Sequence, residues 1–319
     1  MLNISGIKLP MIGNHLVGGN VYFVDSGGDG ASNNNDGLHP SRALATLDGG
    51  INKCTDNNGD FVVLLPGHAE SVSTTIALDV AGIKILGIGH GTLRPNLTQA
   101  TSGSSGVITI SSSNVEIENI YFTGSATGTN ERFLIISTKS QNNITVKNCV
   151  FEQKSKNLDA VTIVGVTNAV AVEYISAIRF EGCKFVGTAA GPDTGINIVP
   201  MASHCAKDIS IVGCHFDYLD SAGIDDGCIA VSLSGGATCT SLLIDNCTAM
   251  GIADGEQFIY LSPGAGTTGL VSNCRVSTAD ATDAVIISNL LSFCGLQLAE
   301  PGKSAAVTKT LHPIATPAA

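Results

Sequence analysis

A short alternation of apolar and polar residues recurs along this chain and ends each time in the same kind of turn. In the clearest copy, ITVKNCVF at 144–151, alternate residues are apolar, and Asn, Cys and an aromatic residue follow. Alternate residues lie on one face of a β-strand, so the pattern predicts a half-buried strand. The Asn or Gly before the cysteine position tolerates a positive φ, which predicts a sharp corner. The copies are VEIENIYF (115–122), ITVKNCVF (144–151), IRFEGCKF (178–185), ISIVGCHF (209–216), LLIDNCTA (242–249) and GLVSNCRV (269–276), with a weaker one, IKILGIGH, at 83–90.

The spacing of these copies predicts a stacked-repeat fold. The position after the corner recurs at 88, 120, 149, 183, 214, 247 and 274, at intervals of 27 to 34 residues. Intervals of roughly 20–45 residues are typical of repeats that stack on one another. Isoleucine holds this position in the first two copies and cysteine holds it in the later ones. We expect these small thiols to stack as an internal structural ladder: Cys149, Cys183, Cys214, Cys247 and Cys274.

A second strand follows about a dozen residues after each corner. These segments are short, rich in β-branched residues and bounded by turn-forming residues, with no helical periodicity between them. Two strands and one corner per repeat predict an all-β, single-stranded parallel β-helix whose coils pair at about 4.8 Å. The general preference of parallel crossovers makes it right-handed. The second strands are expected at 132–137, 160–165, 195–200, 228–233, 257–262 and 284–289.

The two ends of the chain differ from the repeats. Residues 41–58 show the helix-like spacing expected of a short cap over the first coil, with apolar residues at 44, 47, 51 and 54. The expected organisation is an N-terminal arm at 1–20, a β-helix with its cap at 21–294, and a C-terminal arm at 295–319. The first 20 residues have no continuous apolar core, so we expect neither a signal peptide nor a membrane span there.

The amino-acid composition argues against several classes of binding partner. The net charge of −11 argues against binding to nucleic acid or to an anionic membrane. The chain has no Trp and only five Tyr, which counts against a sugar-stacking site. Most of the ten cysteines fall within apolar strands, so we interpret them as reduced core residues rather than disulfides. No cofactor is expected.

The segment at 22–71 resembles the entry segment of the right-handed parallel β-helix superfamily, which includes pectin-degrading lyases, polygalacturonases and phage tailspikes. Within that superfamily, PGHAES at 66–71 and the low aromatic content look most like phage virion proteins, notably trimeric head-decoration (cement) proteins related to tailspikes. The resemblance covers about residues 20–290 and implies a homotrimer bound to a major capsid protein. The shared elements are Tyr22-Phe23-Val24-Asp25, Asp36-Gly37, Pro40, Ala45-Thr46-Leu47, Gly59-Asp60, the apolar strand at 61–65 and Pro66-Gly67.

Many β-helices cleave polysaccharides, so a catalytic site is an alternative for this chain. Asp225-Asp226 resembles the paired aspartates of polygalacturonases, and two carboxylates can supply the acid and base of glycoside hydrolysis. That family also needs Gly-His-Gly and Arg-Ile-Lys later in the chain, whereas Gly89-His90-Gly91 comes earlier and only His312 follows the aspartates. We therefore expect no catalytic residues.

A lyase or zinc site finds equally little support. A lyase would need Arg or Lys above calcium-binding aspartates, and Arg179 and Arg275 stand at outward or corner positions without such a trio. No His-x-x-His or Cys-x-x-Cys spacing predicts zinc.

Acidic residues gather in the loops after the cysteine strands. If the coils are in register, Asp225, Asp226, Asp254 and Glu256 fall on one edge of the body. The simplest interpretation is a solvated edge, because stacked carboxylates repel unless they are solvated, paired or bridged by a cation. A Ca²⁺ site or a docking face for a basic partner stays open as the alternative.

These features together predict a structural virion protein of a bacteriophage. The expected form is a trimeric decoration protein on the outer surface of the capsid, made in the host cytoplasm and lacking enzymatic activity. The alternative is a tailspike-like receptor-binding protein or polysaccharide depolymerase.

Overall fold

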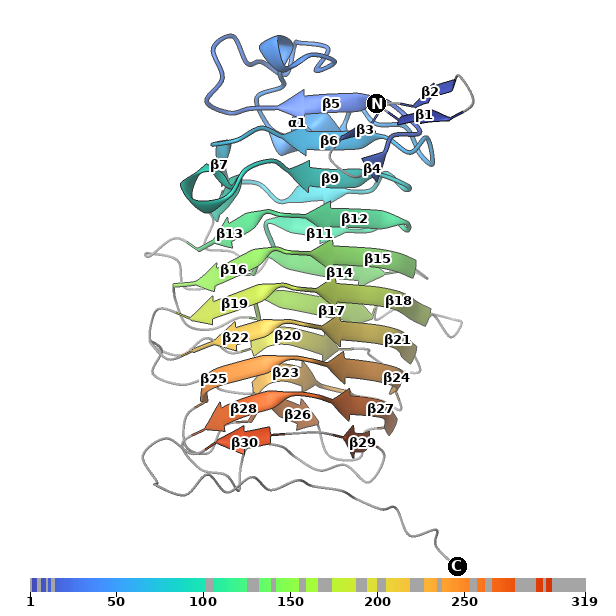
Figure 1. Cartoon of the computed structure of the whole chain (residues 1–319), viewed down its shortest axis with the longest axis vertical. Helices are drawn as coiled ribbons and strands as arrows, with labels where there is room; N and C mark the ends of the chain where they lie inside the picture. The colour runs from blue at the N-terminus through green and yellow to red at the C-terminus, as the bar shows by residue number, and fades with distance from the viewer. Residues whose placement is uncertain are drawn as a thin grey trace, which may run out of the picture.

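Three parallel β-sheets wind along the chain as a parallel β-helix (Figure 1). This confirms the fold class that the sequence predicts. The computed structural model describes residues 2–4, 7–9, 11–12, 15–100, 106–124, 132–138, 142–154, 159–165, 174–187, 194–199, 205–218, 227–233, 237–252, 257–261, 266–278, 291–294 and 297–299.

A complete coil contributes one strand to each sheet, so it has three strands rather than the two predicted. The repeated phrase spans two of them, because its corner separates a strand of the ten-stranded sheet from a strand of the nine-stranded sheet. In one coil these are β15 (Asn142–Lys147) and β16 (Val150–Gln153), and β17 (Val161–Gly165) belongs to the seven-stranded sheet. Within the three sheets the strands of successive coils pair in parallel; β15, for example, pairs with β12 and β18.

The strand bounds follow the repeats. The ten-stranded sheet holds β5 (Val21–Val24), β6 (Phe61–Leu64), β9 (Lys84–Gly87), β12 (Val115–Glu118), β15, β18 (Tyr174–Glu181), β21 (Cys205–Val212), β24 (Thr238–Asp245), β27 (Gly266–Ser272) and β29 (Leu291–Cys294). The nine-stranded sheet holds β7 (Ala69–Val72), β10 (Asn96–Gln99), β13 (Tyr121–Thr123), β16, β19 (Lys184–Gly187), β22 (His215–Asp217), β25 (Thr248–Ile252), β28 (Arg275–Thr278) and β30 (Gln297–Ala299). The seven-stranded sheet holds β8 (Ile76–Leu78), β11 (Ile108–Ile110), β14 (Leu134–Thr138), β17, β20 (Thr194–Val199), β23 (Gly227–Val231) and β26 (Ile259–Leu261). The strand predicted at 284–289 lies outside the described residues.

The predicted corners adopt the left-handed conformation. Their φ angles lie between 52° and 62°, a region that Gly and Asn enter most readily. The corner backbone also continues the ladder between coils, since the N–H of Asn148 donates to the carbonyl of Glu181 at 2.9 Å. The corner residues are Asn119, Asn148, Gly182, Gly213, Asn246 and Asn273.

A second left-handed column, which the sequence did not reveal, precedes the strands of the ten-stranded sheet or kinks the longer ones. Two of its members, Ala177 and Ser241, are residue types that rarely adopt this conformation and gave no turn signal, whereas Asp208 tolerates it. The strand register aligns them with Gly and Asn in the earlier coils. The column runs through Gly59, Gly82, Asn114, Asn143, Ala177, Asp208 and Ser241.

A short helix covers the first coil. Helix α1 (Leu47–Ile51) lies within the predicted cap and buries Leu47 and Ile51 against the core. Thr46 caps it, because its side chain accepts a hydrogen bond from the N–H of Gly49 at 3.0 Å. Two 3₁₀ turns, η1 (Pro40–Arg42) and η2 (Gly91–Leu93), complete the helical content of the described residues.

Both segments predicted as arms contain strands. The N-terminal segment forms two antiparallel pairs, β1 (Leu2–Ile4) with β2 (Ile7–Leu9), and β3 (Met11–Ile12) with β4 (His15–Leu16). At the other end β30 lies within 295–319 and pairs in parallel with β28. The coil pattern therefore extends five residues past 294, to Ala299.

Candidate functional site

The five ladder cysteines form one internal column. Each is at most 1% exposed, and the residues that follow them pair directly from coil to coil. The equivalent Ile120 is fully buried as well, but Ile88 is 37% exposed, because the chain leaves the coil after β9. Nine of the ten cysteines, including all five of the ladder, are free thiols. The column therefore begins at Ile120 and fills the interior.

Four of the ladder thiols, Cys149, Cys214, Cys247 and Cys274, have a raised pKa. Burial raises the pKa of Cys149 to about 12. A hydrogen bond with Cys214 and burial raise the pKa of Cys247 to about 12, and the hydrogen bond with Cys247 raises that of Cys274 further. The Sγ of Cys274 also lies 3.1 Å from the carbonyl oxygen of Ser272, two residues earlier. Thiols in this state are poor nucleophiles and poor metal ligands.

A phenylalanine ladder runs beside the thiols. Phe122, Phe151, Phe185 and Phe216 stack with ring centroids 5.0, 4.9 and 4.8 Å apart. All four side chains are fully buried. The aromatic position two residues after the cysteine is thus a second internal column, which adds stacking to apolar burial.

The four acidic residues proposed for one edge, Asp225, Asp226, Asp254 and Glu256, lie outside the described residues.

Two other loop acids are described, and each has partners within the chain. The Oδ2 of Asp159 accepts hydrogen bonds from Thr162 Oγ1 and Asn197 Nδ2, both at 3.1 Å. Asp217 lies on the outer side of β22, where its Oδ2 is 3.2 Å from the Nζ of Lys184. These two acids belong to different sheets and do not form a joint site.

The residues considered for polysaccharide chemistry are dispersed. The Nε of Arg179 pairs with the Oε2 of Glu181 on the same strand at 3.0 Å, and Arg275 is an exposed residue of β28. His90 is exposed in the loop before η2. All three are exposed, as predicted for Arg179 and Arg275, and they lie on different parts of the coil.

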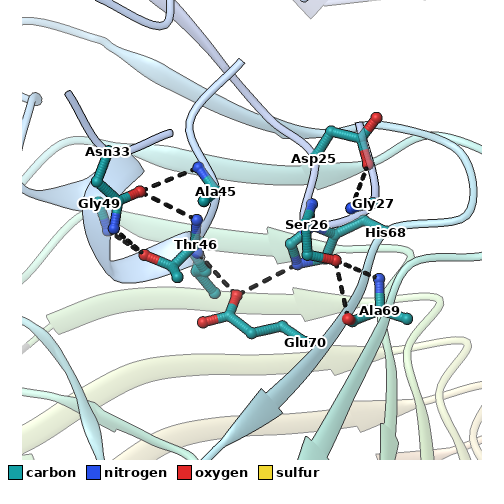
Figure 2. Close-up of polar contacts among 11 residues, drawn as sticks. Asp25, Ser26, Gly27, Asn33, Ala45, Thr46, Gly49, His68, Ala69 and Glu70 are labelled. Carbon is teal, nitrogen blue, oxygen red and sulfur yellow. Dashed lines mark hydrogen bonds and ion pairs between the residues drawn. The ribbon is translucent and has the colours of Figure 1, made fainter. Parts of the chain in front are cut away.

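The structure shows a polar cluster at the capped end that was not predicted from the sequence (Figure 2). The imidazole of His68 has no exposed surface. Its Nδ1 accepts the backbone N–H of Ser26 at 3.0 Å, which places the proton on Nε2, and Nε2 donates to the Oε2 of Glu70 at 3.2 Å. The same oxygen accepts the N–H of Leu47, the first residue of α1, at 2.8 Å. His68 and Glu70 therefore fasten the cap to the second coil.

Serine, histidine and glutamate are the residue types of a nucleophilic triad, but here they are not connected as one. The Oγ of Ser26 donates to the carbonyl of Ala69 at 2.8 Å and accepts its N–H at 2.9 Å. His68 contacts the backbone of Ser26, so no base activates the hydroxyl. The signal in the sequence was PGHAES, which contains both His68 and Glu70.

The outer side of the ten-stranded sheet carries ion pairs between coils. The Nζ of Lys84 lies 3.0 Å from the Oε1 of Glu116 and also contacts Glu118. Lys147 in the next coil reaches the same Glu116 oxygen at 3.2 Å. The two lysines outweigh the effect of burial and lower the pKa of Glu116.

The comparisons with known proteins concern the fold. The chain is similar to pectate lyase Pel9A, with a TM-score of 0.52 and 12% identity over 93% of this chain and 82% of that chain. It is also similar to a rhamnogalacturonan lyase (TM-score 0.47, 14% identity, 86% and 85% coverage) and to ORF18 of Geobacillus virus E2 (TM-score 0.39, 13% identity, 78% and 56% coverage). No family model matches the chain, and no curated protein matches it.

The fold is a parallel β-helix. At 12% identity the likeness to the pectate lyase extends to architecture alone, so chemistry must come from this chain's own residues. Among the residues that the structure describes, no three His, Cys, Asp or Glu side chains gather where they could hold a metal ion. The described helices include none long and apolar enough to cross a membrane.

Proposed function

We propose that this protein is a non-enzymatic structural virion protein of a bacteriophage, a homotrimer that decorates the outer surface of the capsid and stiffens it. The observation that carries the proposal is how the outward polar side chains of the described strands are used. Several of them pair with side chains of neighbouring coils instead of converging on one point.

Such cross-coil pairs occur on two sheets. On the ten-stranded sheet Lys84, Glu116 and Lys147 link three successive coils. On the nine-stranded sheet the hydroxyl of Tyr121 donates to the Oε2 of Glu152 at 2.6 Å, and Lys184 pairs with Asp217. Pairing along the axis supports a stiff rod, because bending would have to break several contacts at once.

The capped end also supports the proposal. The resemblance to phage decoration proteins rests on PGHAES at 66–71 and on the low aromatic content, and His68 and Glu70 of this segment tie α1 to the second coil. A terminal cap with satisfied polar groups is what a free-standing repeat protein needs.

Electron microscopy of purified particles that contain the protein tests the proposal. Density at three-fold positions on the head is the expected result, and density at the tail alone would contradict it. Release of reducing sugar from host polysaccharide would contradict the non-enzymatic part and favour a tailspike-like depolymerase.

The oligomeric state is tested separately. Sedimentation equilibrium should give three times the chain mass of 32.5 kDa. A single-chain mass at all concentrations would rule out the homotrimer.

A further inference from the structure

An ordered apolar loop projects from the corner of the third coil. In later coils two residues separate the strands at this corner, such as Asn119 and Ile120, whereas here the corner loop spans 88–95. Its two large aliphatic side chains are exposed, Ile88 by 37% and Leu93 by 53%. The described residues contain only five exposed large hydrophobics, so two in one loop mark a contact surface.

Hydrogen bonds from the neighbouring coils hold the corner loop in place. Its backbone is tied to the second coil by the N–H of Gly67, which donates to the carbonyl of Leu93 at 2.9 Å. From the fourth coil, Asn119 Nδ2 donates to the carbonyls of Gly87 at 2.8 Å and Gly89 at 2.9 Å. Gly89 has φ 123°, and a Cβ there would lie 2.3 Å from the Leu93 oxygen. A loop held this firmly presents its apolar side chains with little loss of entropy on binding.

An outer apolar face lies beside the corner loop at the same end of the rod. It consists of Val21, Phe23 and Leu65, which are half-buried and pack on a cluster separate from the main core. In β5 the neighbouring Tyr22 and Val24 belong to the main core, so Val21 and Phe23 point to the outer side. In the fourth coil the equivalent outward positions are occupied by acidic residues that form ion pairs.

The distribution of charge on the chain favours a second copy of this chain as the partner of the corner loop. Residues 80–115 contain no Asp or Glu, and the corner loop carries Arg94, in a chain of net charge −11. Beyond the end of β5, the loop of the first coil carries Asp25 and Asp29. One copy thus offers apolar and cationic groups that complement the apolar face and carboxylates of another copy.

We propose that the corner loop of one copy docks against the outer apolar face of the next copy, with Arg94 directed to the acidic loop of that copy. The contact is heterologous, and such contacts close into a ring when the rotation allows it. Both surfaces lie within the first three coils, so copies standing side by side in parallel bring them to the same height. The inference rests on the proposed homo-oligomer and names its surface.

Surface variants test the contact by sedimentation velocity over a range of concentrations. The double variant Ile88→Ser/Leu93→Ser should weaken association at least about tenfold, and Arg94→Glu should weaken it most at low salt. Leu270→Ser and Arg275→Glu are the matched controls, because these residues are exposed at the opposite end and should leave association unchanged. Far-UV circular dichroism must show that each variant keeps the β fold.

The outcomes separate this inference from the proposed function. If the natural chain is trimeric and the double variant is equally trimeric, the contact surface is wrong and the homotrimer stands. If the variant stays trimeric but no longer binds capsids, the loop faces a different protein, which also overturns the inference. A natural chain that sediments as a single chain overturns both.

Discussion

Phe151 stacks on Phe185 with ring centroids 4.9 Å apart and ring planes 16° from parallel. The two rings come from successive coils, where strand register pairs these residues directly. A core built from such columns is stabilised by neighbours above and below each ring, so the middle of the column should be its most sensitive point.

Replacing Phe151 by Ala should lower the free energy of unfolding by about 3–5 kcal/mol, because it removes a ring that packs on Phe122, Phe133 and Phe185. Urea unfolding followed by circular dichroism measures the change. Phe151→Leu keeps much of the volume and should be markedly milder. A loss below about 1 kcal/mol for the Ala variant would mean that the column relaxes around the gap.

The ladder thiols should resist modification in the folded protein. Burial and thiol–thiol hydrogen bonds hold the pKa values of Cys149 and Cys247 at about 12, so little thiolate forms at pH 8. Maleimide labelling followed by peptide mass spectrometry should modify these two only after denaturation. Cys205, which is partly exposed, is the internal control for reagent access. Rapid labelling of Cys149 under native conditions would contradict the closed interior.

Ala177→Gly should stabilise the protein by about 1 kcal/mol. Ala177 is exposed and has φ 54°, a left-handed conformation that is strained for a residue with a Cβ. The control is Ala206→Gly, a buried strand position where the same change should destabilise through added chain entropy. Thermal melting of both variants checks the opposite signs.

Stability should fall in acid partly through Glu116. Burial alone would raise its pKa, but Lys84 and Lys147 lower it below the ordinary value of 4.5. A carboxylate with a lowered folded-state pKa stabilises above its unfolded pKa, and this contribution disappears as pH falls through the folded value. Glu116→Gln should therefore flatten the decline in melting temperature below about pH 5. Glu181→Gln, in the exposed pair with Arg179, should change the profile little.

His68→Ala should loosen the capped end without unfolding the later coils. The change leaves the N–H of Ser26 without its acceptor and removes one partner of Glu70, at a position where the imidazole has no exposed surface. Hydrogen exchange should accelerate in peptides covering 44–52 and 66–72 and stay unchanged around 205–218. His39→Ala, at an exposed histidine in the same cap, should leave the exchange pattern as it is.

Much of this architecture could be predicted because the repeat carries its own turn chemistry. Asn and Gly before the cysteine position predicted left-handed corners, and the corners at Asn148 and Gly182 have that conformation. The third strand per coil was missed, because the residues after the corner, such as those of β16, were treated as the end of the phrase and not as a separate strand. The second left-handed column stayed hidden because coil stacking imposes that conformation on Ala177 and Ser241 against their preference.

The site was harder to predict than the fold. The bond from His68 to Ser26 joins residues 42 positions apart, and that from Glu70 to Leu47 joins residues 23 apart. Only the winding of the first two coils brings these groups together, so no local spacing in the sequence predicts these hydrogen bonds. The corner loop shows the same limit, since its Gly89-His90-Gly91 was set aside as a catalytic motif and nothing in the sequence indicated that it belongs to a loop with two exposed aliphatic side chains.

Strand β5, which begins the first coil, limits how these rods can join. The outer edge of β5 is already engaged, because the N–H of Phe23 donates to Gly37 at 2.7 Å and its carbonyl accepts from Leu44 at 2.8 Å. A strand edge that is occupied in this way cannot template another chain. Longitudinal polymerisation is therefore blocked at this pole, which gives the rod a direction and confines growth of any higher assembly to its flanks and its opposite end.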